Sequence, residues 1–365
     1  MTAPAQVRAA VIGTSGWADS AHLPGLQARG DVEVAALCGR NPERLAALAG
    51  KYRIPRTFTD YRQLLAEVRP EVVVIATPNH THAPMARAAL EAGAHVICEK
   101  PLALDAGEAA QMLAQAEALG RRHLTFLTYR GLPATRYLKT LIDEGYLGRL
   151  HHVQGCYLHA SWLDPARPAS WKTIRAEGGS GVLHDLGAHV IDLLQWWFGP
   201  VARAAGSLQT FIGERQRDGV RVRVETDDAT ACALEFEGGG QATLQLSRVA
   251  PGRHNYQRFE LYGDRGVLVY EYDQPWAHIG RIWGARAGAY DLEPIPIPAA
   301  LTDGFAGQET FPAIYRAVTD PFFAALDAPG PSPAPSFAEG LAAQRVIDAV
   351  ARSAASGRWE AAAFA

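Results

Sequence analysis

Val96-Ile97-Cys98-Glu99-Lys100-Pro101 is the expected end of a buried strand, followed by a turn that carries a lysine. The run of apolar residues without polar alternation is typical of a parallel strand that is covered on both faces. Pro101 restricts the backbone next to Lys100. A lysine held at the mouth of such a strand is a candidate proton donor, so we expect chemistry at this turn.

Strands and helices alternate on both sides of this turn. Apolar runs predict strands at residues 7–12, 32–38, 72–77, 95–98 and 123–128. Helices are predicted between them, and Asn41 and Asp105 are suited to cap two of these helices. Alternation at this short spacing requires parallel strands joined by right-handed crossovers. The sequence therefore predicts an α/β domain over residues 1–128, built as a doubly wound Rossmann sheet.

A glycine-rich loop, Gly13-Thr14-Ser15-Gly16-Trp17-Ala18, follows the first strand. Ligands in such sheets bind beyond the carboxyl ends of the strands, and backbone N–H groups of a glycine-rich loop can approach a pyrophosphate. A tight turn without a ligand is the alternative, but the complete βαβ unit favours a bound dinucleotide. The coenzyme contacts expected in this loop are Gly13, Ser15, Gly16, Trp17 and Ala18.

The loop after the third strand reads Thr77-Pro78-Asn79-His80-Thr81-His82. Its polar groups are expected to line the coenzyme site through Thr77, Pro78, Asn79 and His82, and Thr81 is expected to help cap the next helix. Two histidines this close also occur in metal sites, but no third ligand lies near them in the sequence. No metal is therefore expected.

Two motifs in the chain resemble those of the glucose-fructose oxidoreductase / inositol dehydrogenase / MocA (Gfo/Idh/MocA) family. The first is Glu99-Lys100-Pro101 with residues 76–82 ahead of it. The second is residues 178–192, GGSGVLHDLGAHVID, which is similar to the family's glycine-rich approach to an Asp-x-x-x-His helix. Tyr129-Arg130 and residues 144–148 also fit the family's pattern. The resemblance covers nearly the whole chain.

This resemblance implies an NAD(P)-dependent dehydrogenase or reductase. Such an enzyme transfers a hydride between the nicotinamide and a hydroxyl or carbonyl carbon of a sugar, cyclitol or related polyol. By this resemblance, Lys100, Asp185 and His189 match the family's catalytic residues. Glu99 and Lys100 are also expected to contact the coenzyme. The family's second domain implies a homodimer or homotetramer, formed through its sheet.

The loop after the second strand, Cys38-Gly39-Arg40-Asn41, bears on the choice of coenzyme. NAD sites usually place an acidic residue here for the ribose hydroxyls, and this loop has none. The Arg40 guanidinium suits a 2′-phosphate, although a solvated surface arginine is about as common. We therefore expect NADP in preference to NAD. Other departures from the family's pattern are Ser15 in the first loop and Thr128 ahead of the Tyr-Arg pair.

Asp185 and His189 are four residues apart, so on a helix they share one face. Histidine titrates near neutrality, which suits a general base, and Asp185 is expected to orient a partner or bind a substrate hydroxyl. Gly187 is expected to permit the close approach of a ligand. Each residue also has an ordinary structural alternative: a helix cap for Asp185, a core histidine for His189 and a solvated loop lysine for Lys100. The match to all three residues together favours catalysis.

Residues 129–365 are expected to form an α+β domain for substrate binding and oligomerisation. Strands are predicted at residues 150–160, 221–236, 241–248, 257–262 and 266–272, with glycine-rich turns that indicate antiparallel hairpins. Polar–apolar alternation predicts an open-faced, mainly antiparallel sheet with helices on one face. An uncovered sheet face usually finds a partner. A helix over 337–353 closes the chain and is expected at the domain junction.

Residues 161–178 form an insertion ahead of Asp185 and are expected to wall the substrate pocket. Aromatic rings stack on sugar faces, although loop tryptophans are as often packing residues. The expected substrate contacts are Tyr129, Arg130, Trp162, Trp171 and Lys172.

Composition excludes other classes of function. The 365 residues fit two domains, and the formal net charge of −3 gives no electrostatic basis for nucleic-acid binding. No apolar run approaches the roughly 20 residues that span a bilayer, and residues 1–6 lack a signal pattern. Four scattered cysteines are typical of a reducing compartment. A cytoplasmic enzyme without nucleic-acid or membrane partners is expected.

Two other functions are compatible with the same fold. One is a non-catalytic dinucleotide-binding sensor or regulator, and the other is a sugar-modifying enzyme that uses tightly held NAD for transient oxidation. A sensor has no need for Lys100, Asp185 and His189 together, which favours the oxidoreductase.

Overall fold

A computed structural model describes residues 6–273, 279–305, 310–330 and 332–363. The chain divides into two compact units: residues 1–128 with 308–341, and residues 129–307 with 342–365. The second domain expected from the sequence ran without interruption from 129 to 365. Residues 308–341 lie instead with the first unit, because helix α10 (Thr310–Ala324) packs on the first unit's sheet.

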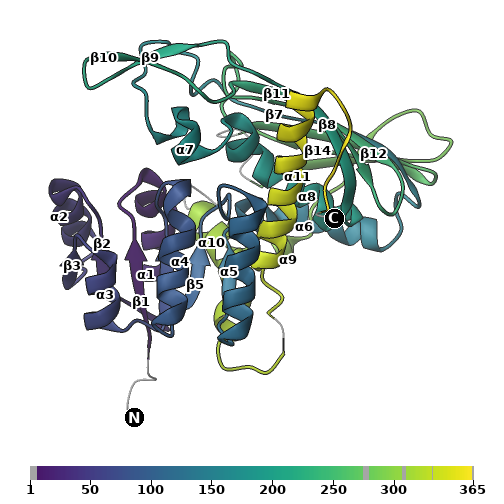
Figure 1. The fold of residues 1–365 in the computed structure, drawn as a ribbon. Coiled ribbons are helices and arrows are strands. Elements are labelled where there is room, and N and C mark those ends of the chain that lie inside the picture. The colour runs from purple at the N-terminus through teal and green to yellow at the C-terminus, as the bar shows by residue number, and fades with distance from the viewer. Residues whose placement is uncertain (1–5, 274–278, 306–309, 331, 364–365) are drawn as a thin grey trace. The chain divides into compact units, whose positions relative to one another are not determined.

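The first unit contains a six-stranded parallel sheet in the order β3-β2-β1-β4-β5-β6 (Figure 1). Its strands are β1 (Val7–Ile12), β2 (Val32–Cys38), β3 (Arg56–Phe58), β4 (Val72–Ile75), β5 (His95–Cys98) and β6 (His123–Thr125). In the register of the sheet, Ile12 pairs with both Cys38 and Ile75, and Cys98 pairs with Thr125. The carboxyl ends of the central strands therefore align, and the predicted doubly wound fold is confirmed.

Helices cover both faces of this sheet. One face packs against α1 (Leu23–Gln27), α2 (Pro42–Lys51) and α10, and the other against α3 (Tyr61–Val68), α4 (His82–Glu91) and α5 (Ala106–Ala118). Successive residues of β4 alternate between the two cores, and all four are 0% exposed. Burying one such aliphatic side chain contributes about 1.5–3 kcal/mol. Two covered faces explain why the strands are apolar throughout.

Two of the three predicted helix caps are present. The Asn41 side chain accepts from the Arg44 N–H at 2.9 Å, and Asp105 accepts from the Glu108 N–H at 2.8 Å. Thr81 makes no capping bond, because its hydroxyl donates to the Pro78 carbonyl at 2.6 Å within the 3₁₀ turn η2 (Asn79–Thr81). The prediction of a Thr81 cap was therefore wrong.

The second unit is built on a nine-stranded sheet in the order β16-β15-β14-β13-β7-β12-β11-β8-β17 (Figure 1). Its strands are β7 (Leu150–Leu158), β8 (Val201–Gln209), β11 (Ala229–Phe236), β12 (Gln241–Ser247), β13 (Tyr256–Gly263), β14 (Gly266–Tyr272), β15 (Arg281–Arg286), β16 (Glu293–Pro294) and β17 (Glu360–Ala361). Only β7 and β12 pair in parallel; the other neighbours are antiparallel. The prediction of a mainly antiparallel sheet is confirmed.

One predicted strand was wrong. Residues 221–236 do not form a single strand, because β10 (Val220–Arg223) pairs with β9 (Glu214–Arg217) in a separate hairpin. The chain then turns at Asp227 and Asp228, whose buried carboxylates bind backbone N–H groups of other segments. Because Asp227 and Asp228 form this turn, they belong to neither strand, and β11 begins at the next residue.

The helices of the second unit are α6 (Pro133–Asp143), α7 (Arg175–Gly178), α8 (Ala188–Phe198), α9 (Ala299–Thr302) and the later part of α11 (Phe337–Ser356), with short turns η3 (Thr128–Gly131), η4 (Trp171–Thr173) and η5 (Leu183–Gly187). Leu244 and Leu246 on β12 are buried, whereas Thr243 and Gln245 between them are exposed. One face of this sheet is therefore covered, and the other is open in this chain. No helix in the described segments is long and apolar enough to cross a membrane.

Candidate active site

The first glycine-rich loop has the geometry of a close backbone approach. Gly13 has φ +130°, and a Cβ there would lie 2.2 Å from the Ala76 carbonyl oxygen, so only glycine fits. A Cβ on Gly16 would meet nothing within 4 Å, so packing within the protein does not explain that glycine. The Ser15 hydroxyl accepts from the Ala18 N–H at 3.2 Å, where the π-helical turn η1 (Ala18–His22) begins. A small loop with free space at a helix start fits a pyrophosphate.

Gly39 has a packing role that the sequence did not indicate. A Cβ on Gly39 would lie 2.4 Å from the Thr14 side chain, so the absence of an acid here allows the second loop to approach the first. Arg40, the next residue, is exposed at the end of β2. Its guanidinium is therefore accessible to a coenzyme ribose or phosphate.

His82 connects two of the expected coenzyme loops. Its ring is 0% exposed, with Nδ1 2.9 Å from the Pro101 carbonyl and Nε2 2.9 Å from the Thr77 carbonyl. Burial lowers the pKa of His82, while the two carbonyl contacts oppose that shift. The imidazole thus holds residues 77–82 against the Glu99-Lys100-Pro101 turn from inside the unit.

Glu99 is fixed by a partner that the sequence did not reveal. Its Oε1 lies 2.7 Å from Nε2 of His22, and its Oε2 accepts from the Lys100 N–H at 3.2 Å. His22 is 0% exposed and Glu99 is 6% exposed, so this pair is removed from water. His22 belongs to η1, directly after the glycine-rich loop. One carboxylate therefore joins that loop to the turn carrying Lys100, whose peptide bond to Pro101 is cis.

In the second unit, Asp185 and His189 lie on one continuous helical segment formed by η5 and α8. Asp227 caps the start of this segment, accepting from the N–H groups of Gly181 at 2.6 Å and Leu183 at 3.0 Å. Asp185 therefore does not serve as the helix cap. A Cβ on Gly181 would lie 2.0 Å from the Asp227 carbonyl oxygen, which explains the last glycine of the glycine-rich approach.

Gly187 lies between the helix and the sheet. A Cβ there would lie 3.1 Å from the Leu183 side chain and 3.4 Å from that of Leu246 on β12. The missing side chain therefore favours close packing of the helix on the sheet, and the close approach of a ligand at Gly187 stays a prediction.

The Asp185 carboxylate binds the Lys172 ammonium at 2.7 Å. The side chains are 21% and 33% exposed, so the pair is accessible to small molecules but partly shielded from water. Lys172 was expected to contact the substrate, and in this structure its ammonium is paired with Asp185.

His189 packs against an aromatic wall. Its ring is 7% exposed and lies 4.7 Å from the Tyr129 ring in an edge-to-face arrangement. The Tyr157 hydroxyl donates to Asn255 Oδ1 at 2.5 Å, the Asn255 amide donates to the Tyr129 hydroxyl at 2.9 Å, and the Tyr129 hydroxyl donates to Tyr157 at 2.6 Å. Burial raises the pKa of Tyr157 well above its ordinary value. This closed ring of hydrogen bonds holds the Tyr129 side chain in place beside His189.

Two more expected substrate contacts have their functional groups engaged within the unit. Arg130 forms a bidentate pair with Asp192, at 2.8 and 2.6 Å. Trp162 is 4% exposed and carries three arginine guanidinium groups 4.4–5.1 Å from its ring centre. The Trp162 ring is therefore covered by cations and is not presented for stacking on a sugar. Trp171 is half-buried next to Lys172.

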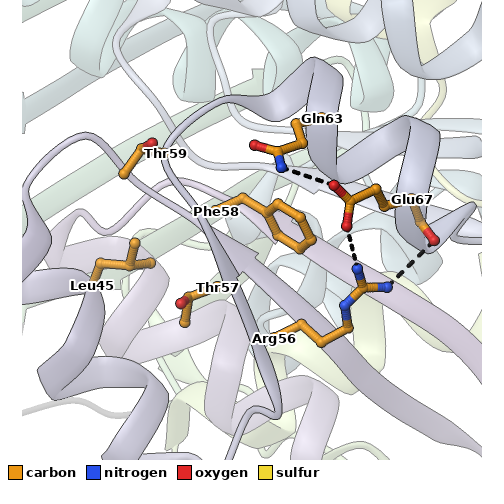
Figure 2. Close-up of a pocket in the computed structure, with 7 residues that line it drawn as sticks. All are labelled: Leu45, Arg56, Thr57, Phe58, Thr59, Gln63 and Glu67. Atoms are coloured by element: carbon orange, nitrogen blue, oxygen red, sulfur yellow. Dashed lines mark hydrogen bonds and ion pairs between the residues drawn. The ribbon is translucent and has the colours of Figure 1, made fainter.

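A surface hollow of about 440 Å³ in the first unit lies at β3 and α3. Figure 2 shows Arg56 and Gln63 converging there on the carboxylate of Glu67, at 2.6 and 2.8 Å. This polar hollow satisfies its own charges. Within the described residues, no group of three or more histidine, cysteine, aspartate or glutamate side chains is arranged to hold a metal ion.

Comparisons with known proteins agree with this arrangement. Residues 7–126 match the family model described as an oxidoreductase family with an NAD-binding Rossmann fold, and residues 135–269 match the GFO/IDH/MocA C-terminal domain. Levoglucosan dehydrogenase of Pseudarthrobacter phenanthrenivorans is 32% identical over 346 residues, which cover 87% of each chain. D-glucoside 3-dehydrogenase of Escherichia coli is 29% identical over 248 residues, covering 66% of this chain and 70% of that protein.

Solved structures show the same fold. An oxidoreductase domain protein from Kribbella flavida has a TM-score of 0.89 and 32% identity, covering 99% of this chain and 100% of its own. A levoglucosan dehydrogenase in complex with NADH also has a TM-score of 0.89, with 29% identity over 99% of this chain and 100% of its own.

Proposed function

The chain belongs to the Gfo/Idh/MocA family of oxidoreductases, and we propose that it transfers a hydride between a nicotinamide coenzyme and one carbon of an uncharged sugar, cyclitol or related polyol. It is an NAD(P)-dependent oxidoreductase that acts on CH–OH groups, and similar proteins are named dehydrogenases and reductases of sugars. The observation that carries the proposal is Asp185 and His189 on one helical segment, in a chain that also holds Lys100 at the end of β5. The sensor and the transient-oxidation enzyme are not favoured.

A bound nicotinamide coenzyme supplies the hydride acceptor or donor. The residues proposed to hold it are Gly13, Ser15, Gly16, Trp17, Ala18, Arg40, Thr77, Pro78, Asn79, Glu99 and Lys100, with His82 supporting two of their loops from within. Gly16 leaves room for the pyrophosphate beside backbone N–H groups, and Gly13 lets the loop pack closely against Ala76.

His189 is proposed as the general base. During oxidation, its imidazole takes the proton of the substrate hydroxyl, and during reduction it returns that proton. For Lys100 we propose a separate role, in which its ammonium donates a hydrogen bond to the reacting oxygen and stabilises the negative charge that develops there. Asp185 accepts a hydrogen bond from a substrate hydroxyl and orients it. The Tyr129 wall keeps the His189 ring in one orientation.

The charges of the second unit favour an uncharged substrate. Both cations that the sequence placed near the substrate have a carboxylate partner: Lys172 pairs with Asp185, and Arg130 pairs with Asp192. A phosphate or carboxylate on the substrate would have to displace one of these carboxylates. Neutral polyols only exchange hydrogen bonds, which makes them the better fit.

A substrate panel tests this proposal. Purified protein is assayed with NAD and with NADP against matched triplets such as glucose, glucuronate and glucose 6-phosphate, together with levoglucosan and inositol, by absorbance at the nicotinamide band. We expect turnover of neutral members and at least tenfold lower kcat/KM for their anionic counterparts. Turnover of none, or a preference for the anionic members, would refute the proposal.

NADP is proposed as the preferred coenzyme because Arg40 follows β2 where an acid would serve the ribose of NAD. Arg40→Ala is expected to raise the KM for NADP at least tenfold and to change that for NAD less than threefold. Arg44→Ala, on the exposed side of α2, is the matched control and should change neither. Equal use of both coenzymes by the unmodified protein would contradict the assignment.

We also propose a cytoplasmic homodimer or homotetramer formed through the open face of the second unit's sheet. This face carries a hollow of about 500 Å³ over β7, β8, β11 and β12. The hollow is lined in part by residues with small side chains: Ala205, Ser207, Ala231 and Ala233. Small side chains allow a second sheet to approach closely. Sedimentation of the purified protein gives the oligomeric state, and Ala231→Arg should dissociate an assembly built on this face.

A further inference from the structure

The ammonium of Lys172 needs a fixed position in order to act on Asp185. Its side chain is long and one-third exposed, and a free lysine side chain loses conformational entropy when it is immobilised. A 2.7 Å contact with a partly exposed carboxylate is weak support by itself, because ion pairs that water can reach contribute little to stability. The backbone that carries Lys172 must therefore be held by other contacts.

The turn that carries Lys172 is closed by its own side chains. Ser170 Oγ accepts from the Lys172 N–H at 3.2 Å, and the Thr173 hydroxyl donates to the Ser170 carbonyl at 2.7 Å. Together with a weaker bond from the Ser170 N–H to Thr173, these contacts form a capping box around η4. The local conformation of residues 170–173 is thereby restricted.

A buried cluster, which we call the Arg248 clasp, anchors this turn from behind. It consists of Arg248, Asp228 and Thr226, which are each at most 1% exposed. The Thr226 hydroxyl donates to the Lys172 carbonyl at 2.9 Å, and Arg248 Nη1 reaches the same oxygen at 3.4 Å. Arg248 also donates to Asp228 at 2.9 Å and to the Thr226 hydroxyl at 3.1 Å. A guanidinium this deep is stable only while its donors are satisfied, so the clasp has little freedom to move.

The same guanidinium holds the beginning of the insertion. Arg248 lies 4.9 Å from the centre of the Trp162 ring, and Arg215 of the β9–β10 hairpin lies 5.1 Å from it. Arg215 Nη2 also donates to the Trp162 carbonyl at 2.5 Å. Arg248 therefore contacts both Trp162 and Lys172, which gives the buried insertion tryptophan a structural role.

We propose that Lys172 is a positioning residue for the reaction: held at its backbone by the Arg248 clasp, its ammonium keeps the Asp185 carboxylate in the orientation that a substrate hydroxyl requires. This inference rests on the proposed function, in which Asp185 binds the substrate. It differs from a direct substrate contact by Lys172 in one measurable respect: Lys172 has no effect once Asp185 cannot form the ion pair.

A double-mutant cycle on the full-length protein tests this difference. Lys172→Met removes the ammonium and keeps the length of the side chain; we expect kcat to fall ten- to a hundredfold while KM changes less than threefold. Lys172→Arg restores a cation and should recover at least a third of kcat. In the Asp185→Asn background, Lys172→Met should cost no more than about threefold in addition, because the pair is already broken.

Thr226→Val tests the clasp with little change in volume. It removes the hydroxyl that binds the Lys172 carbonyl, and we expect a three- to tenfold loss of kcat, with thermal unfolding monitored to confirm the fold. Lys139→Met is the matched control: Lys139 pairs with Asp143 at 2.5 Å on α6, and its loss should leave kcat within twofold.

The outcomes separate this inference from the function on which it rests. If Asp185→Asn leaves kcat unchanged, the proposed role of Asp185 fails. If Asp185→Asn lowers kcat but Lys172→Met does not, or if the two losses multiply in the double variant, Lys172 does not act through Asp185 and this inference is overturned. A rise in KM with unchanged kcat in Lys172→Met would likewise overturn it, because that is the behaviour of a substrate anchor.

Discussion

Replacing His22 by leucine is expected to destabilise the first unit and slow the reaction together. His22 Nε2 donates to Glu99 Oε1 at 2.7 Å, and no described residue provides a hydrogen-bond partner for Nδ1. Glu99 uses its other oxygen to hold the Lys100 N–H. Loss of His22 thus leaves a buried carboxylate without its main donor, directly before the proposed catalytic lysine.

The size of the effect follows from the burial of both partners. A hydrogen bond to a charged group contributes about 1.5–3 kcal/mol, and this one is short and shielded from water, so we expect a loss of about 2–3 kcal/mol in the free energy of unfolding. Leucine occupies similar space between the Phe126 and Tyr315 rings, which keeps any cavity small. A displacement of the Lys100 turn by about 1 Å costs up to a hundredfold in rate, and we expect kcat to fall at least tenfold.

Urea unfolding and steady-state kinetics measure the two effects in the same samples. His22→Gln retains a donor and should recover much of the stability and rate that His22→Leu loses. Glu91→Gln changes an exposed carboxylate in the same unit that only accepts from Gln115, and should shift the unfolding free energy by less than about 0.5 kcal/mol. If His22→Leu unfolds at the wild-type urea concentration and keeps its kcat, the pair does not position Lys100.

Three further predictions concern other buried groups. Burial lowers the pKa of His123 to about 4, and its Nδ1 accepts from the Phe337 N–H, so its contribution to stability is complete above the ordinary histidine pKa and is lost as the pH falls from about 6.5 toward 4. Urea titrations should show the unfolding free energy decreasing by at most about 3 kcal/mol over this window, with a flatter profile in His123→Asn. Asp228→Asn leaves the Arg248 guanidinium buried without its counter-charge and should lower the unfolding free energy by about 3–5 kcal/mol; a loss under about 1 kcal/mol would contradict this. Gly13→Ala should abolish coenzyme binding in a fluorescence titration, because its Cβ would meet a carbonyl oxygen at 2.2 Å, whereas Gly30→Ala, which meets nothing within 4 Å, should bind normally.

The central strands of the first unit were predicted well because their local sequence pattern is distinctive. A residue run such as Val72–Ile75 has no polar position, and only a strand covered on both faces requires that pattern. β3 was missed for the opposite reason, since Arg56 and Thr57 are exposed at the sheet edge and only Phe58 is buried. In the second unit, polar–apolar alternation continues from the β10 hairpin toward β11. No local signal showed that the buried carboxylates of Asp227 and Asp228 interrupt the strand.

The candidate site likewise combines residues that the local sequence indicates with partners that it does not indicate. Lys100, Asp185 and His189 were selected by motif, from their neighbours along the chain, and their catalytic role stays a prediction. His22 was missed because it lies 77 residues from Glu99, and Asp227 because it lies 46 residues from Gly181. The glycine at 181 was a usable signal, since a residue that must be glycine implies a close neighbour, but it does not say which residue that neighbour is.

The amino-acid sequence alone determined the buried central strands of the first unit, and it supplied the predictions of a pyrophosphate loop and of Lys100, Asp185 and His189 as the residues that carry the chemistry. These features depend on side-chain type and on spacing within a few residues, and both are visible in one chain. Only the tertiary structure decided which partner each buried charge has: Glu99 with His22, Asp185 with Lys172, Asp228 with Arg248. A buried charge must find a donor or a counter-charge wherever the folded chain provides one, and that position depends on the packing of distant segments and not on local sequence.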